Sequence, residues 1–97
     1  MTNEEMYPLT YSLVSGIKEE AFSHISEEQK RSFENSVKFV EPDIAITKAL
    51  GWSIDGIWKL SDRIAESVRL WGENASRKAY RRIADLALQN AGLPGLV

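Results

Sequence analysis

Apolar positions recur three and four residues apart along the chain, and no stretch alternates apolar and polar residues as a half-exposed strand would. This spacing predicts an all-α fold. Five helical segments account for nearly all of the sequence, and neither a linker nor an internal repeat divides them. We therefore predict a single domain, residues 1–97, that folds as a compact bundle of about five short helices.

Capping signals mark the first two helices. Pro8 suits the first turn of the first helix, because its missing N–H would have no helical partner there. Ser26 followed by Gln29 is typical of a capping box, so a second helix is expected to begin at this point and to end at Pro42. Its apolar face consists of Phe33, Val37 and Val40.

A glycine and a serine are expected to separate the third helix from the fourth. Pro42 can open a short third helix, and Gly51 is predicted as the left-handed residue at its C-terminal end. Ser53 would then cap the fourth and longest helix, which runs toward Gly72. On this helix, Trp58 and Trp71 fall on the core face.

The fifth helix is predicted between Asn74 as its N-cap and Gly92 at its C-terminal end. Its expected inner face consists of Ala79, Tyr80, Ile83, Leu86, Ala87 and Asn90. An apolar tail, residues 93–97, follows.

The composition is that of an ordinary folded protein, with 43% hydrophobic and 27% charged residues. The absence of cysteine excludes disulfides, thiolate metal sites and a cysteine nucleophile, and a reducing compartment is expected. No apolar run approaches the roughly 18 residues that span a bilayer, and the acidic N-terminus is unlike a secretory signal. We therefore expect a cytoplasmic protein that is not inserted in a membrane.

Residues that could assemble a catalytic centre are few. His24 is the single histidine and is expected at the surface near a helix C-terminus. Most carboxylates of the first half come as adjacent pairs, which point about 100° apart on a helix and do not converge on one substrate. The glycines are scattered and form no phosphate-binding loop. We predict a protein that is not an enzyme and that binds neither a metal nor a cofactor.

Charge is unevenly distributed. The net charge is −2, but residues 1–43 hold nine acidic and four basic side chains, whereas residues 44–97 hold five acidic and eight basic ones. Four cations cluster on the outward face of the fifth helix: Arg77, Lys78, Arg81 and Arg82. One interpretation is a solvated face with ion pairs to Glu73 and Asp85. The other is a binding surface, either for an acidic surface of a partner protein or for the backbone of a nucleic acid.

A local pattern offers a different function. Residues 46–60, ITKALGWSIDGIWKL, resemble a helix-turn-helix unit, with a turn glycine and a serine that caps the second helix. The resemblance implies a DNA-binding regulator that uses residues 44–63, with nucleic acid as the partner. Its recognition helix would span residues 53–63, and its expected DNA-binding residues are Ser53, Asp55, Lys59 and Arg63. An ordinary helical corner would give the same pattern, and the sequence pI of about 5.4 lacks a basic footprint.

Exposed apolar residues suggest self-association. Leu70 falls among the charged residues of the fourth helix, and the tail adds Leu93, Leu96 and Val97. Trp52 is expected to lie exposed in a turn. A second copy of the chain could cover these residues, so a homodimer is a further hypothesis. As the first hypothesis for function, we expect a small, non-catalytic protein–protein interaction module of the regulator, adaptor or inhibitor kind. It would bind its partner through the fifth helix and Leu70.

Overall fold

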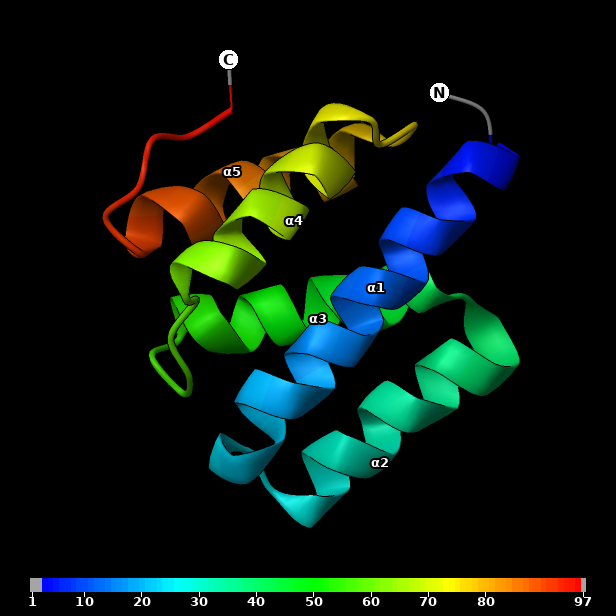
Figure 1. The fold of residues 1–97 in the computed structure, drawn as a ribbon. Coiled ribbons are helices and arrows are strands. Elements are labelled where there is room, and N and C mark those ends of the chain that lie inside the picture. Colours follow the sequence, from blue (N-terminus) through cyan, green and yellow to red (C-terminus); the bar gives the residue numbers. More distant parts are fainter. Residues whose placement is uncertain (1–2, 97) are drawn as a thin grey trace.

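The structure, a computed structural model, describes the backbone of residues 3–96 and the side chains of residues 7–96. Within this part of the chain there are five α-helices, two short helical turns and no strand, which confirms the all-α fold. The elements are α1 (Asn3–Ala21), the 3₁₀ turn η1 (Phe22–His24), α2 (Glu27–Asn35), the π turn η2 (Ser36–Val40), α3 (Pro42–Ile54), α4 (Asp62–Glu73) and α5 (Lys78–Asn90). Figure 1 shows α4 and α5 side by side in the upper part of the bundle and α2 at its lower edge.

One hydrophobic core joins the five α-helices. Its apolar side chains range from Leu13 in α1 to Leu88 in α5, and α2 contributes Phe33. Trp71 is fully buried and Trp58 is 4% exposed, so the prediction that both tryptophans face the core is confirmed. Each helix is therefore held mainly by the burial of its own apolar face, as is usual for helices of this length.

The capping box that was predicted for α2 is present. The Gln29 backbone N–H donates to Ser26 Oγ at 3.0 Å, and the Ser26 N–H donates to Gln29 Oε1 at 2.8 Å. The start of α1 differs from the prediction, because the helix begins at Asn3 and Pro8 lies inside it. Pro8 is the sixth residue of α1 and has no N–H, so one backbone hydrogen bond of the second turn is not made.

The boundary between α3 and α4 was predicted wrongly. Gly51 continues α3, and the residue in the left-handed conformation is Gly56, with φ of 83°. The Ile57 N–H donates to the Trp52 carbonyl and the Gly56 N–H to the Ser53 carbonyl, which is the Schellman arrangement for ending a helix. Ser53 is consequently a buried residue of α3, and Trp52 is a half-buried residue of the same helix.

The ends of α4 and α5 also shift. Ser61 caps α4 by accepting the Ile64 N–H, so the fourth helix is much shorter than predicted. Asn74 does not cap α5. It follows the end of α4, where its side chain donates to the Leu70 carbonyl at 2.8 Å.

The position before α5 is occupied by Arg77, which makes no side-chain cap, whereas Gly92 ends α5 as predicted. The buried residues of α5 are Tyr80, Ala84, Ala87 and Leu88. Ala79, Leu86 and Asn90 were predicted on the inner face but are exposed.

The second helix ends in a π turn that the apolar spacing did not reveal. The predicted apolar face contained Val40, yet Val40 is 68% exposed. A π turn is wider than an α turn, so Val40 is rotated away from the face of Phe33, whereas Val37 at the start of the turn still packs against the core. Phe39 and Val40 therefore point outward at the corner between α2 and α3.

The C-terminal tail folds back on its own chain. Arg69 donates from its two terminal nitrogens to the carbonyls of Pro94 and Gly95, at 2.6 and 3.0 Å. Leu96 is half-buried, and its N–H donates to Asp85 Oδ1 at 2.7 Å. Leu93 and Leu96 pack against the core instead of facing solvent, which corrects the expectation of an exposed apolar tail. Val97 lies outside the described residues.

Candidate interaction surface

The cationic turn, which we define as Arg77, Lys78, Arg81 and Arg82, lies at the start of α5. All four side chains are exposed, as the helical spacing predicted. Arg81 reaches back toward α4, with its Nη1 3.5 Å from the Glu73 carbonyl. For Lys78 and Arg82, no carboxylate lies within ion-pair distance among residues 7–96. The structure therefore gathers the predicted cations and leaves two of them available to a partner.

The position of these cations opposes the helix dipole. The N-terminal end of a helix carries a partial positive charge, so a cation there costs about 0.3–1 kcal/mol relative to a neutral residue. Arg77 and Lys78 occupy the cap and first helical positions of α5, and the first turn holds no acidic residue. Local helix stability therefore gives no reason for cations at this end.

The Tyr80 side chain supports the cationic turn. The Arg77 guanidinium lies 5.7 Å from the centre of the Tyr80 ring, within the range of a cation–π contact. The Tyr80 hydroxyl donates to Glu41 Oε1 at 2.8 Å, and its ring stacks on Trp71 at 5.6 Å. Trp71 in turn donates from Nε1 to Asp43 Oδ1 at 2.8 Å. These contacts fix the start of α5 to the start of α3.

The environment of Tyr80 changes its acidity. Burial, followed by the hydrogen bond to Glu41 and the charge of that carboxylate, raises the pKa of Tyr80 to about 12. Each cause disfavours a phenolate, because the anion would lose hydration and would lie beside a carboxylate. The folded protein consequently binds the Tyr80 proton more tightly than the unfolded chain does.

We expect the stabilisation by Tyr80 to disappear in strong alkali. Because the pKa of Tyr80 is raised from about 10 to about 12, its contribution is complete below about pH 10 and is lost as the pH rises through about 12. The difference in urea midpoint between the wild type and Tyr80→Phe should therefore shrink across this range. Tyr11→Phe, at a 45% exposed position in α1, is the control for the removal of a phenol elsewhere. A constant difference for Tyr80→Phe would contradict this pKa.

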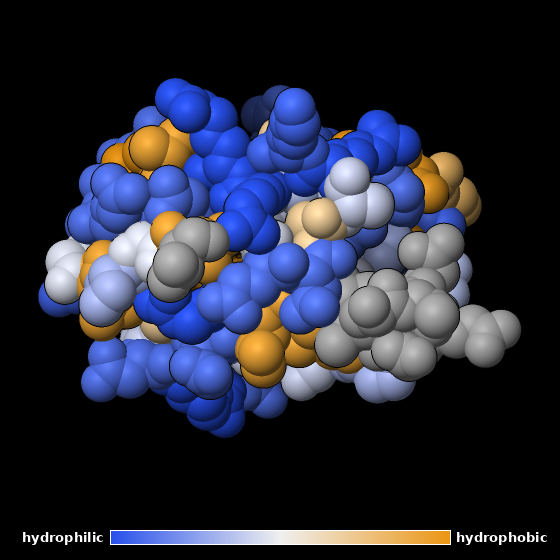
Figure 2. All heavy atoms as spheres, turned by 90° about the horizontal axis from the view of Figure 1, so that it is seen from above, coloured by the Kyte–Doolittle hydropathy of each residue, from blue (hydrophilic) through white to orange (hydrophobic). Residues whose placement is uncertain are grey.

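A shallow depression adjoins the cationic turn and adds an apolar contact. It has a volume of about 260 Å³ and is lined by Lys78, Arg81, Arg82, Asp85 and Leu96. Figure 2 shows that hydrophilic residues dominate this upper face of the molecule, with small separate hydrophobic patches among them. Leu70 is 40% exposed, as predicted, and lies one helical turn before Glu73, toward which Arg81 reaches. A partner at this surface would meet cations first and apolar groups second.

No family model, curated protein or solved structure matches this chain.

The four residues predicted to contact DNA do not share a helix. Ser53 is buried in α3, where its hydroxyl donates to the Leu50 carbonyl at 2.7 Å. Asp55 ends α3, and Lys59 lies in the loop that follows. Arg63 belongs to α4 and pairs with Glu19, with 2.7 Å between Nη2 and Oε2. The predicted recognition helix of residues 53–63 is therefore absent, because Gly51 continues α3 and the chain turns at Gly56.

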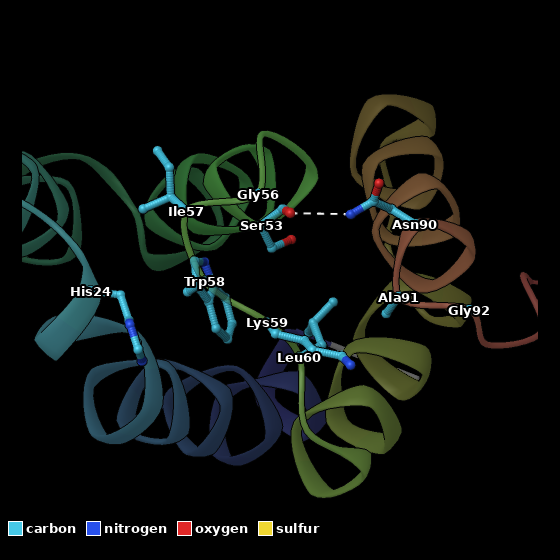
Figure 3. A pocket seen from close by; sticks show the side chains of 10 residues that line it. All are labelled: His24, Ser53, Gly56, Ile57, Trp58, Lys59, Leu60, Asn90, Ala91 and Gly92. Carbon is cyan, nitrogen blue, oxygen red and sulfur yellow. Dashed lines mark hydrogen bonds between the residues drawn. The ribbon is translucent and has the colours of Figure 1, made fainter.

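An open cleft of about 600 Å³ lies between η1, the loop after α3 and the C-terminal end of α5. Figure 3 shows His24 on one side of this cleft and Asn90 on the other, with Trp58 and Leu60 between them. Asn90 is held by donating to the Ser53 carbonyl at 3.1 Å. The Ser53 hydroxyl in this lining donates to the Leu50 carbonyl at 2.7 Å.

The described residues form neither a metal-binding cluster nor a membrane-spanning helix. Within them, no group of three or more histidine, aspartate or glutamate side chains is arranged to hold a metal ion. Among the helices that the structure describes, none is both long and apolar enough to cross a membrane.

Sequence reasoning missed the exposed residues of the π turn. Phe39 is 78% exposed and is the most exposed large hydrophobic side chain among residues 7–96. A signal was present, because Phe39 does not share the helical spacing of Phe33 and Val37 and therefore has no place on the apolar face. The nearby Lys48 carries no signal in the sequence, since its importance depends on contacts with α2.

Proposed function

We propose that this protein is a small, non-catalytic interaction module of the cytosol that binds an acidic surface of a partner protein through the cationic turn. The observation that carries the proposal is the cluster of four exposed cations at the start of α5, two of which, Arg77 and Lys78, lie where the helix dipole disfavours them. A cost of this kind is offset when a partner supplies carboxylates to the same site.

The surroundings of the cationic turn support protein as the partner. The depression beside the cationic turn combines cations with Leu96, and arginine next to an apolar side chain is common where proteins bind one another. Arg77 is already positioned by Tyr80, so less side-chain freedom is lost when it binds. A duplex would favour a continuous basic surface, whereas the chain as a whole carries a net charge of −2.

Charge reversal should weaken partner binding selectively. We expect Lys78→Glu and Arg82→Glu each to lower the affinity for the partner about tenfold or more, because each places a carboxylate against an acidic surface. The measurement is quantitative capture from a cell extract with the tagged protein, followed by titration of the purified partner. Lys59→Glu reverses an exposed cation in a different loop and is the matched control.

Three outcomes would reject the proposal. Capture that is unchanged by both reversals would remove the cationic turn as the binding surface. An equal loss with Lys59→Glu would show a general effect of charge. Partners that are released by nuclease treatment would indicate nucleic acid as the true ligand, with binding that falls steeply as salt rises.

A further inference from the structure

The side chain of Lys48 is held in an unusual way for a lysine. It extends from α3 to α2, where its Nζ donates to Ser32 Oγ at 2.9 Å and to Ser36 Oγ at 2.8 Å. Ser36 is 2% exposed, and its own hydroxyl donates to the Ser32 carbonyl at 3.0 Å. An ammonium group has three donors, so the third is not used by these contacts. No carboxylate among residues 7–96 lies within ion-pair distance of Lys48.

The half-buried Lys48 lies in an open groove of about 560 Å³ beside the π turn. Phe39 and Val40 form one wall and are 78% and 68% exposed. Arg31 adds a second cation, and Glu28 is the one acidic residue of the lining. The groove thus combines a positioned ammonium with two adjacent apolar side chains that the core does not use.

We propose that this groove docks an acidic amphipathic segment of a partner protein. One carboxylate of the segment accepts the remaining Lys48 donor, and neighbouring apolar side chains cover Phe39 and Val40. Helical peptides that bind to grooves in this way present anchors three and four residues apart. The inference concerns a surface other than the cationic turn and does not depend on the function proposed for that turn.

Two other occupants fit the groove less well. A flat lipid surface would meet the exposed Phe39, but the ammonium of Lys48 is half-buried and tied to α2, so lipid head groups would have to enter the groove. A twofold contact between two copies of this chain would place the same patch against itself. It would then bring Arg31 and Lys48 of both copies together, which like charges oppose.

The test uses a short helical peptide with leucines three and four positions apart and glutamates on both flanks, together with a second peptide in which glutamine replaces every glutamate. Binding is followed by amide chemical shifts of the isotope-labelled protein. We expect the acidic peptide to shift signals from α2, the π turn and Lys48, and the glutamine peptide to bind about tenfold more weakly or worse.

Four variants of the full chain locate the site. Lys48→Met and Phe39→Ser should each weaken binding of the acidic peptide about tenfold or more. Lys59→Met and Leu86→Ser remove an exposed cation and an exposed apolar side chain elsewhere and should leave it unchanged. Phe39→Ser alters a surface residue, so it keeps the test decisive if Lys48→Met perturbs the packing of α2 on α3.

Several results would overturn the proposal. They are equal binding of both peptides, no binding of either, or shifts confined to other surfaces. Sedimentation with vesicles of phosphatidylcholine and phosphatidylserine that is lost in Phe39→Ser would assign the groove to a lipid surface. A dimeric mass in light scattering that becomes monomeric in Phe39→Ser would assign it to a second copy of the chain.

Discussion

Replacing Trp71 with alanine is expected to lower the free energy of unfolding by about 3–5 kcal/mol, the range observed when large buried aromatic side chains are truncated. Trp71 is fully buried, and its ring stacks on Tyr80. Its loss would leave a cavity between α4 and α5, and Asp43 would lose the donor that lies 2.8 Å away. For a domain of this size, such a loss is a large part of the total stability.

Urea unfolding followed by circular dichroism would measure this effect. Trp71→Phe retains an aromatic ring but not the N–H. The decrease in its free energy of unfolding should therefore be smaller and should come mainly from the unpaired Asp43. Trp52→Ala is the control, because Trp52 is only half-buried and lies at the edge of the core. A loss for Trp71→Ala that does not exceed that for Trp52→Ala would contradict the central role of Trp71.

Replacing two helical glycines with alanine should change the free energy of unfolding in opposite directions. A Cβ at Gly72 would lie 2.6 Å from Ala84 Cβ and 2.9 Å from Leu96 Cδ1, so Gly72→Ala would force α4 and α5 apart. We expect a loss of about 1–3 kcal/mol, as is typical of an overpacked contact. Gly51 is also helical but has no atom within 4 Å of a built Cβ. Gly51→Ala should therefore gain about 0.5–1 kcal/mol.

Thermal or urea unfolding of the two variants measures whether the free energy of unfolding falls or rises in each. Ala84→Gly, introduced together with Gly72→Ala, should restore part of the lost stability because it removes the atom that is contacted. A stabilising effect of Gly72→Ala, or no recovery in the double variant, would show that α4 and α5 do not approach each other this closely.

Local signals in the sequence were sufficient for part of the fold. Ser26 and Gln29 form their capping box from residues three positions apart, and Gly92 ends α5 through bonds to its own last turn. Both features depend only on neighbours in the chain, so the pattern of residue types predicts them. The burial of Trp71 likewise follows from the helical spacing of apolar residues in α4, whereas Trp58, which was predicted on the same helix, is buried from the loop after α3.

The misplaced end of α3 shows where such reasoning fails. Glycine inside a helix costs only about 1 kcal/mol, which other contacts can offset. Here Asn90, far along the chain, donates to the Ser53 carbonyl in the last turn of α3, and Trp58 donates to the Ala49 carbonyl. Neither contact can be read from the sequence around Gly51.

The cationic turn was predicted from the sequence and the groove beside the π turn was not, because only the groove depends on contacts between distant residues. The cationic turn was visible as a cluster of like charges, and only its place at the very start of α5 is new. The groove beside the π turn was not foreseen, because it depends on Lys48 reaching Ser32 and Ser36 across two helices. A contact between elements, rather than a motif within one, creates this site.

A single hydrogen bond links the neighbourhoods of the two surfaces. Tyr80, which lies under Arg77, donates to Glu41, and Glu41 directly follows Val40. A ligand that displaces Tyr80 would therefore also act on the residue next to the π turn. By thermodynamic linkage, if the first ligand changes the affinity for the second by some factor, the second changes the affinity for the first by the same factor. If both proposed surfaces bind partners, the hydrogen bond between Tyr80 and Glu41 is the contact through which we expect the two binding events to influence each other.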